Sequence, residues 1–212
     1  NGQIVAYAED TSDWNAPERI DASGLLVLPG GIDVHTHFEE PDPDLLEGFT
    51  SGGRAAAAGG LTSVVEMPQA RPTTTTPAQF ADKVRLVKEH AVVDMALWAG
   101  AIGPPQQSAD DLTAMSDLGA AAFKSFMASS SPLFPAVDTA QMLGVMEQAA
   151  ELGIPYGLHA EDQSLLQAGL ARTEGMGRRD PLAHAESRPP IVETVAVSTA
   201  LLLAAETGCR AH

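Results

Sequence analysis

The sequence is poor in cysteine, in basic residues and in long apolar runs. Its single cysteine, Cys209, excludes an internal disulfide framework and fits a reducing cytoplasm. Only 12 Lys and Arg accompany 28 Asp and Glu, so the formal net charge of -16 argues against a nucleic-acid partner, whose phosphates need a basic surface. No apolar run reaches the roughly 18 residues of a membrane span. No basic segment followed by an apolar one opens the chain, so we expect no membrane partner and no export signal.

The two ends of the 212-residue chain both suggest a fragment of a longer protein. The first residue is Asn1 rather than methionine. The last residues, GCRAH, follow an apolar helical stretch at the point where a new strand would begin. We therefore expect further sequence on either side.

Two regions differ in pattern. Residues 1–28 hold short β-prone runs between turn residues, which predict two or three strands of a partial β-sandwich domain. Residues 29–212 show evenly spaced apolar runs with helical stretches between them, a pattern typical of parallel strands joined by crossover helices. These runs begin near Ile32, Leu61, Val92, Ala120 and Ile154.

Such a series closes either as an eight-stranded barrel or as an open doubly wound sheet. No Gly-x-Gly-x-x-Gly follows the first run, which disfavours the dinucleotide-binding form of the open sheet. We predict an α/β fold in which residues 29–212 are the N-terminal part of a TIM (β/α)8 barrel. The chain has room for only about five and a half of the eight units.

The stretch LPGGIDVHTHFEEP carries the first functional signal. His35 and His37 are separated by one residue at the end of an apolar run, so a strand would point both imidazoles the same way, toward one metal ion. Such a pair is weak evidence alone, but the end of a barrel strand is where this fold carries its chemistry.

Two further residues end later strands. Lys124, in GAAAFKSFM, lies in an almost wholly apolar run, where desolvation favours a neutral amine able to capture carbon dioxide as a carbamate. The alternative is a lysine whose ammonium reaches solvent. His159 follows the apolar run of IPYGLHAED and could also be a packed histidine. Their joint occurrence at strand ends favours one shared site.

The combination resembles the cyclic amidohydrolases, the family of allantoinase, dihydroorotase and hydantoinase. The resemblance covers essentially the whole chain. It rests on PGGIDVHTHFEEP, EGFTSGGRAAAAGGLTSVVEMP, FKSFM and GLHAED, and the allantoinase branch is most similar in ESRPPIVETVAV and TGCRAH.

The resemblance implies two divalent metal ions, usually zinc. His35 and His37 would bind one ion and His159 the second, while Lys124, as its carbamate, would bridge both. A metal-bridging hydroxide would then open the ring of a cyclic amide. A fourth metal histidine beyond His212 and a proton-shuttling aspartate are expected outside this chain. The resemblance also implies a homo-oligomer, commonly a tetramer.

Departures from the family motifs bear on the substrate. Dihydroorotases have an arginine at the position of Glu39, whose charge would instead repel the carboxylate of dihydroorotate. Gln69 replaces an asparagine that follows Met-Pro in dihydroorotases, and it breaks the Met-Pro-Leu-Asn of allantoinases. Ser129 stands where dihydropyrimidinase-type hydantoinases carry a tyrosine, and a small hydroxyl residue suits allantoinases better.

Allantoin, opened to allantoate, is therefore the leading substrate. Dihydroorotase and hydantoinase or dihydropyrimidinase activities are the first alternative. The second is a catalytically silent relative that uses the barrel as an assembly surface. Such relatives typically lose metal ligands, and the four candidate ligands of this chain count against it.

Overall fold

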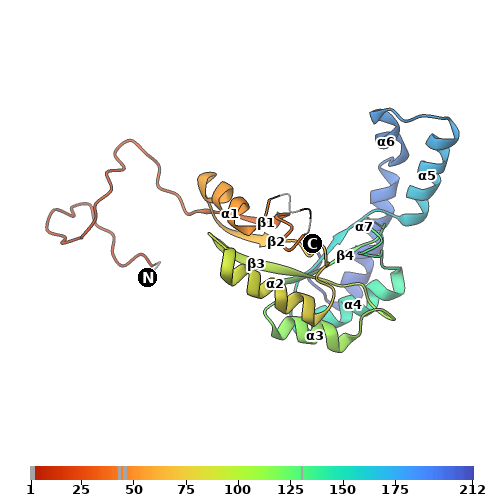
Figure 1. Cartoon of the computed structure of the whole chain (residues 1–212), viewed down its shortest axis with the longest axis horizontal. Helices are drawn as coiled ribbons and strands as arrows, with labels where there is room; N and C mark the ends of the chain where they lie inside the picture. The colour runs from red at the N-terminus through yellow and green to blue at the C-terminus, as the bar shows by residue number, and fades with distance from the viewer. Residues whose placement is uncertain (1–2, 43, 45–46, 130) are drawn as a thin grey trace.

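Five parallel strands form one curled sheet in sequence order in this computed structural model, which describes residues 3–42, 44, 47–129 and 131–212 (Figure 1). Each strand pairs with the next one along the chain, so the crossovers all run in one direction around the sheet. The strands are β1 (Gly31–Thr36), β2 (Leu61–Glu66), β3 (Asp94–Gly100), β4 (Ala122–Phe126) and β5 (Tyr156–His159).

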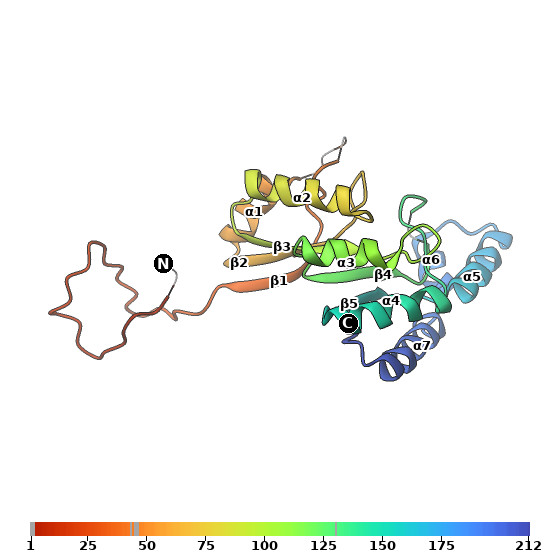
Figure 2. The ribbon, with the colours of Figure 1, turned by 90° about the horizontal axis from the view of Figure 1, so that it is seen from below.

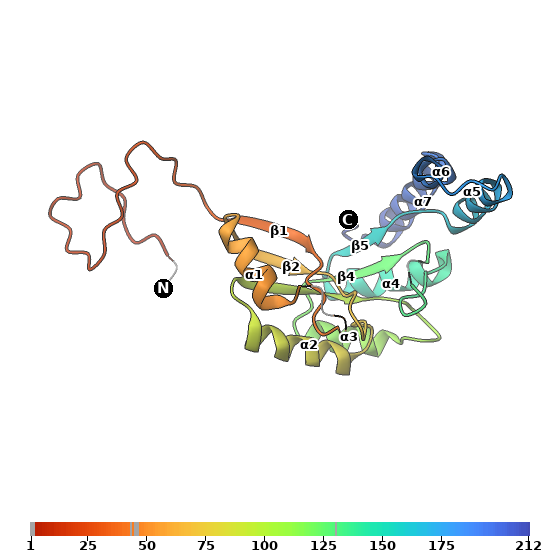
Figure 3. The ribbon, with the colours of Figure 1, turned by 45° about the horizontal axis from the view of Figure 1, so that its top comes forward.

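The helices alternate with the strands and cover one side of the sheet. Figures 2 and 3 show α1 and α2 on the same side of β1–β3, and Figure 1 shows α5 and α6 projecting beyond the end of the sheet. The helices are α1 (Phe49–Ala58), α2 (Pro77–His90), α3 (Ala109–Asp117), α4 (Thr139–Leu152), α5 (Gln163–Gly175), α6 (Pro181–Ser187) and α7 (Ile191–Thr207).

Local capping signals set the helix ends. Ser108 with Asp111 and Asp138 with Gln141 form complete capping boxes at the starts of α3 and α4, as their spacing predicts. Gly153 ends α4 in the left-handed conformation, with φ 68°, which glycine adopts without steric cost. Helix ends of this kind can be read from the sequence because they depend only on neighbouring residues.

The main core lies between the sheet and its helices. A second, smaller cluster of Met67, Trp98 and Ala122, with Val65 beside it, lies on the inner face of the curl. There the indole N–H of Trp98 donates to the carbonyl oxygen of Val34 at 2.9 Å, which ties β3 to β1 across the inner face. The largest fully buried apolar side chains are Tyr156, Phe49, Phe80, Phe123, Phe134, Met67, Met115, Met142 and Met146.

The last residues pair with β5 where the sequence predicts a sixth strand. Ala211 forms a parallel bridge with Tyr156 of β5. The N–H of Leu158 donates to the carbonyl oxygen of His212 at 2.9 Å, and the His212 ring lies 6.2 Å from that of Trp98. The chain thus extends the curl in the sense of a closing barrel.

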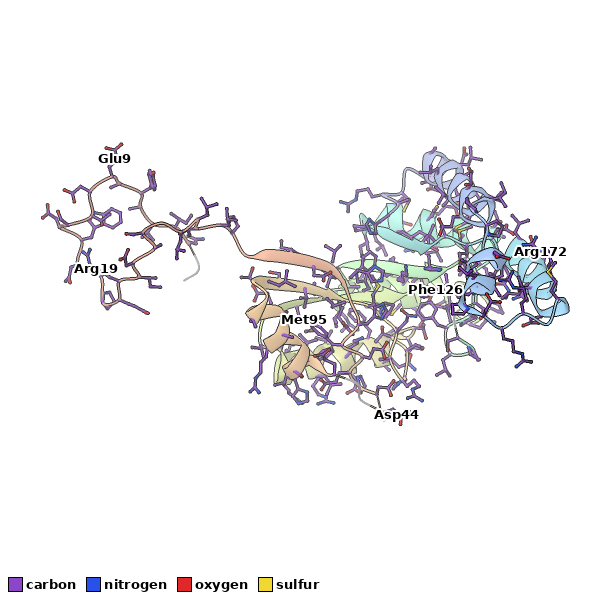
Figure 4. All side chains as sticks on the ribbon, turned by 90° about the horizontal axis from the view of Figure 1, so that it is seen from above. Glu9, Arg19, Asp44, Met95, Phe126 and Arg172 are labelled. Carbon is purple, nitrogen blue, oxygen red and sulfur yellow. The ribbon has the colours of Figure 1, made fainter. Side chains whose placement is uncertain are left out.

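The strands predicted within residues 1–28 are absent from the part of that segment that the structure describes, residues 3–28. Its β-prone side chains, such as Ile4, Val5 and Leu26, are almost fully exposed. Figure 4 shows Glu9 and Arg19 on an arm far from the sheet. A strand needs a partner for its backbone hydrogen bonds, and here the arm pairs with none of the described strands. The division at residue 28 stays a prediction.

Among the described residues, no single helix is both long and apolar enough to cross a membrane. The bent pair α6 and α7 reaches that length and composition only when the two helices are taken together. The buried residues of α7, Val192, Ala196 and Ala200, all belong to or adjoin the protein core.

Candidate metal centre

The end of β1 presents two imidazoles on one face. Side chains alternate along a strand, so His35 and His37 share the inner face while Thr36 points to the helix side and is buried. The ring centroids of His35 and His37 are 5.4 Å apart. Asp33, on the same face, accepts the backbone N–H of His35 at 2.9 Å. The predicted pairing of these histidines on one side of the strand therefore agrees with the structure.

Lys124 lies in β4, where every residue is buried, and only 4% of it is exposed. Its Nζ atom is 5.1 Å from the centroid of the Phe126 ring. Desolvation lowers the pKa of Lys124 to about 8. Among the described residues, no carboxylate forms an ion pair with it. Burial therefore makes the neutral amine far more accessible near physiological pH than it is for an exposed lysine.

The histidine pair and the lysine lie close enough for their charges to interact. The pKa of His35 is lowered first by its partial burial, and then by the positive charges of Lys124 and His37. These side chains come from β1 and β4, which are separated by two strands in the sheet. The curl of the sheet is what brings them together.

His159 is the last residue of β5 and lies at the same edge of the sheet, where the strands have their carboxyl ends. It pairs in register with Phe126 across β5 and β4, and its ring centroid is 5.5 Å from that of Phe126. Figure 4 places Phe126 where β4 ends, on the side of the molecule from which α5 projects. The Nε2 atom of His159 is 3.1 Å from a carboxylate oxygen of Glu161, and half of its side chain is exposed. Lys124 and His159 thus flank one aromatic ring.

The donor set fits a divalent metal only if Lys124 takes part. Within the described part of the chain, no three His, Cys, Asp or Glu side chains cluster closely enough to hold an ion by themselves. Imidazoles suit zinc, and a carbamate on Lys124 would add the anionic oxygens that the cluster lacks. The metal roles of His35, His37, Lys124 and His159 stay predictions; the structure places His35 and His37 side by side, with the charge of Lys124 acting on His35.

Two of the three predicted substrate residues line one cavity. Glu39 and Gln69 contribute to a space of about 170 Å³ at the ends of β1 and β2, together with Thr73 and Phe134. The Glu39 carboxylate lies 3.6 Å from Nδ1 of His37, so this cavity opens beside the histidine pair. Arg71, also in its wall, is neutralised by Asp42 and Asp44.

Ser129 is not among the residues that line this cavity. It is exposed, and its N–H donates to the side-chain oxygen of Gln163, at the start of α5, at 2.8 Å. Ser131, two residues further on, lines the cavity instead. The motif spacing picks out position 129, but it does not predict which residues of the loop after β4 face the cavity.

Behind the histidine pair the sequence points to Glu66, which ends a strand facing the site, but sequence reasoning missed Lys83. Glu66 ends β2 and Lys83 lies in α2, and both side chains are completely buried and form an ion pair. Lys83 shares its helix face with Phe80, Val84 and Val87, and a lysine on an apolar face is the signal that could have found it. His90, at the end of α2, keeps 42% of its side chain exposed and pairs with Glu40.

The comparisons with known proteins agree with this geometry. The model of the amidohydrolase family matches residues 26–208. The chain belongs to the amidohydrolase family. The resemblance expected from the motifs is thereby confirmed, and so is the incomplete barrel, since five parallel strands alternate with helices around a curl.

Similar curated proteins are allantoinases and hydantoinases. The allantoinase of Rubrobacter xylanophilus is 42% identical over 214 residues, covering 100% of this chain and 46% of that protein. The L-hydantoinase of Paenarthrobacter aurescens is 35% identical, covering 99% of this chain and 46% of that protein. The chain thus spans about half the length of the curated relatives it matches.

A solved structure gives the same picture. The L-hydantoinase (dihydropyrimidinase) from Arthrobacter aurescens superposes with a TM-score of 0.92 at 36% identity, covering 99% of this chain and 46% of that one. The D-hydantoinase from Bacillus sp. AR9 gives a TM-score of 0.84 at 31% identity, covering 98% and 45%.

Proposed function

We propose that the full-length protein containing this chain is a metal-dependent hydrolase that opens the ring of a cyclic amide. The observation that carries this proposal is a buried lysine without a carboxylate partner beside two histidines at the carboxyl ends of barrel strands. The family and the similar allantoinases and hydantoinases support it.

Lys124 has the chemistry needed to become a metal bridge. Its lowered pKa leaves a neutral amine that adds to the carbon of carbon dioxide, and the proton released goes to solvent. The product is a carbamate with two oxygen donors. Bound divalent metals, which we propose to be zinc, would polarise the ring carbonyl and supply a hydroxide nucleophile at neutral pH. His35 and His37 would hold the ion nearer β1.

Allantoin is the leading substrate. The allantoinase of Rubrobacter xylanophilus has the higher identity of the two relatives described above. Glu39 supplies a carboxylate that can accept hydrogen bonds from the N–H groups of a neutral ureide, and it would repel a substrate that carries its own carboxylate. Gln69, in the same cavity, offers both a donor and an acceptor.

A hydantoin is the second candidate substrate. It is favoured by the TM-score of 0.92 with the L-hydantoinase from Arthrobacter aurescens. Dihydroorotate has less support, because its carboxylate would face Glu39 rather than an arginine.

Two measurements on the full-length protein test the proposal. Ring opening of allantoin, a 5-substituted hydantoin, dihydrouracil and dihydroorotate is compared by kcat/KM, and we expect allantoin first and dihydroorotate last. Zinc content is compared between the wild type, Lys124→Ala and the exposed-lysine control Lys88→Ala. Only Lys124→Ala should lose metal and activity. Full zinc content in Lys124→Ala would contradict the metal role, and zinc binding without any ring opening would favour a silent assembly protein.

A further inference from the structure

The carboxylate of Glu66 accepts hydrogen bonds from the residues on both sides of His37. The hydroxyl of Thr36 donates to Oε2 at 3.0 Å, the N–H of Phe38 donates to Oε2 at 2.9 Å, and the N–H of Glu39 donates to Oε1 at 2.9 Å. No described contact joins Glu66 to the imidazole of His37. The carboxylate therefore fixes the backbone that carries this histidine and leaves the ring free.

Lys83 holds Glu66 in place from the helix side. Its Nζ atom donates to the carbonyl oxygen of Met67 at 2.8 Å and lies 3.6 Å from Oε1 of Glu66. Both side chains are completely buried. An ionised carboxylate in such a place needs a counter-charge and several donors, and this one has all of them.

Glu39, in the loop that follows β1, has a strained backbone conformation that neighbouring contacts must stabilise. Its φ is 55°, and it is the one non-glycine residue with a positive φ in the described ranges. Residues other than glycine rarely adopt this left-handed backbone conformation. In this conformation the Glu39 carboxylate lies 3.6 Å from Nδ1 of His37. At 3.6 Å this is an electrostatic contact rather than a hydrogen bond, and a carboxylate on the Nδ1 side favours Nε2 as the nitrogen that meets a metal.

We propose, on the basis of the function proposed above, that Glu66 is a positioning residue for His37. Supported by Lys83, it clamps the backbone on both sides of the histidine and holds Glu39 in its left-handed conformation. The Nε2 atom of His37 is thereby kept ready for the metal before any metal binds. Glu66 itself touches neither metal nor substrate.

Three variants of the full-length protein separate positioning from general stability. Glu66→Gln removes the ionised acceptor of the two backbone N–H groups. Lys83→Met breaks the same buried pair but leaves the Glu66 oxygens in contact with the loop. The double variant Glu66→Gln with Lys83→Met leaves no unpaired charge, so it should fold even if either single variant does not. Each metal-free protein is titrated with zinc against a competing chelator, and its melting temperature is measured.

We expect zinc affinity to fall roughly 10- to 100-fold in Glu66→Gln and in the double variant, the range seen for residues that orient metal ligands. Lys83→Met should lower the melting temperature as well but reduce zinc affinity less than Glu66→Gln does, because the Glu66 oxygens still accept the hydrogen bonds of the loop. If zinc affinity instead follows the melting temperature across all three variants, Glu66 is merely structural. Unchanged zinc affinity in the double variant would also overturn the proposal.

Amide hydrogen exchange of Phe38 and Glu39 in the metal-free protein gives a readout that needs no enzymatic activity. Exchange at both amides should be faster in the double variant than in Lys83→Met. If these results hold and no cyclic amide is opened, the proposed function fails alone. If the wild type opens rings and the Glu66 variants bind zinc normally, only the positioning role fails. A wild type that binds no zinc would overturn both.

Discussion

Two buried lysines in this molecule have opposite surroundings. Lys83, in α2, has Glu66 beside it, and the neighbouring Glu39 and Glu40 also act on its charge. Lys124, in β4, has the Phe126 ring beside it and no ion-pair partner among the described side chains. Burial lowers the pKa of both amines. Only at Lys83 do nearby carboxylates oppose that effect.

The difference separates a structural lysine from a chemically available one. A buried ammonium that is paired and hydrogen-bonded holds two elements together, as Lys83 joins α2 to the end of β2. A buried amine without a partner has its pKa shifted into the range where it reacts. The carboxyl ends of the strands therefore carry a hydrogen-bonded ion pair behind His37 and an amine without an ion-pair partner at Lys124, among the described residues.

The largest effect on stability is expected from Lys83→Met. Breaking a buried ion pair leaves the Glu66 carboxylate without its counter-charge and should lower the free energy of unfolding by about 3–5 kcal/mol. Chemical denaturation of the metal-free full-length protein measures this value, with Lys88→Met on the exposed side of the same helix as the control. A Lys83→Met protein as stable as the control would mean that the pair is not structural.

Lys124→Met should change stability in the opposite direction. Because the pKa of Lys124 falls from 10.5 unfolded to about 8 folded, keeping it protonated below pH 8 costs the metal-free folded protein about 3 kcal/mol. The variant should therefore be more stable than the wild type at pH 7. The gain should shrink as pH rises above 8 and vanish near 10.5. A gain that does not depend on pH would show that packing, not charge, is responsible.

The strand and helix sequence could be predicted because it depends on local patterns. Evenly spaced apolar runs mark strands that are packed against helices, and caps such as Ser108 with Asp111 involve only near neighbours. The curl that brings His35 near Lys124 was expected from the evenly spaced runs and the missing Gly-x-Gly-x-x-Gly motif rather than from any single residue. The β-prone runs of residues 3–28 form no strand in the described structure, because β-propensity does not supply a partner strand.

The support behind the site could not be predicted from spacing. Glu66 and Lys83 come from a strand and a helix, and only their packing shows that the two charges meet. Similarly, the loop after β4 directs Ser129 toward α5 and Ser131 toward the cavity, which depends on backbone turns that the motif does not encode. Contacts between side chains of different strands, helices and loops depend on the tertiary structure, which the spacing of residues in the sequence does not give.

Gly52→Ala tests the packing of α1 against the loop that follows His37. A Cβ atom at Gly52 would lie 2.4 Å from the ring of Phe38, which follows His37, so the ring must shift. Such overpacking should cost about 1–3 kcal/mol of unfolding free energy. Gly144→Ala, in α4, is the matched control, since nothing lies within 4 Å of its Cβ and alanine favours the helix. Equal stability of the two variants would mean that Phe38 moves freely.

The smallest effect is expected from Arg85→Ala, which removes an exposed partner of carboxylates on the helix that carries Lys83. Arg85 pairs with Asp82 at 2.9 Å and with Glu89 at 2.8 Å, and about half of each side chain is exposed. Water and salt screen such pairs, and alanine is the better helix former, so the melting temperature should not change measurably. Thermal unfolding in low and high salt checks this. A loss comparable to that of Lys83→Met would show that burial does not distinguish the ion pairs of α2.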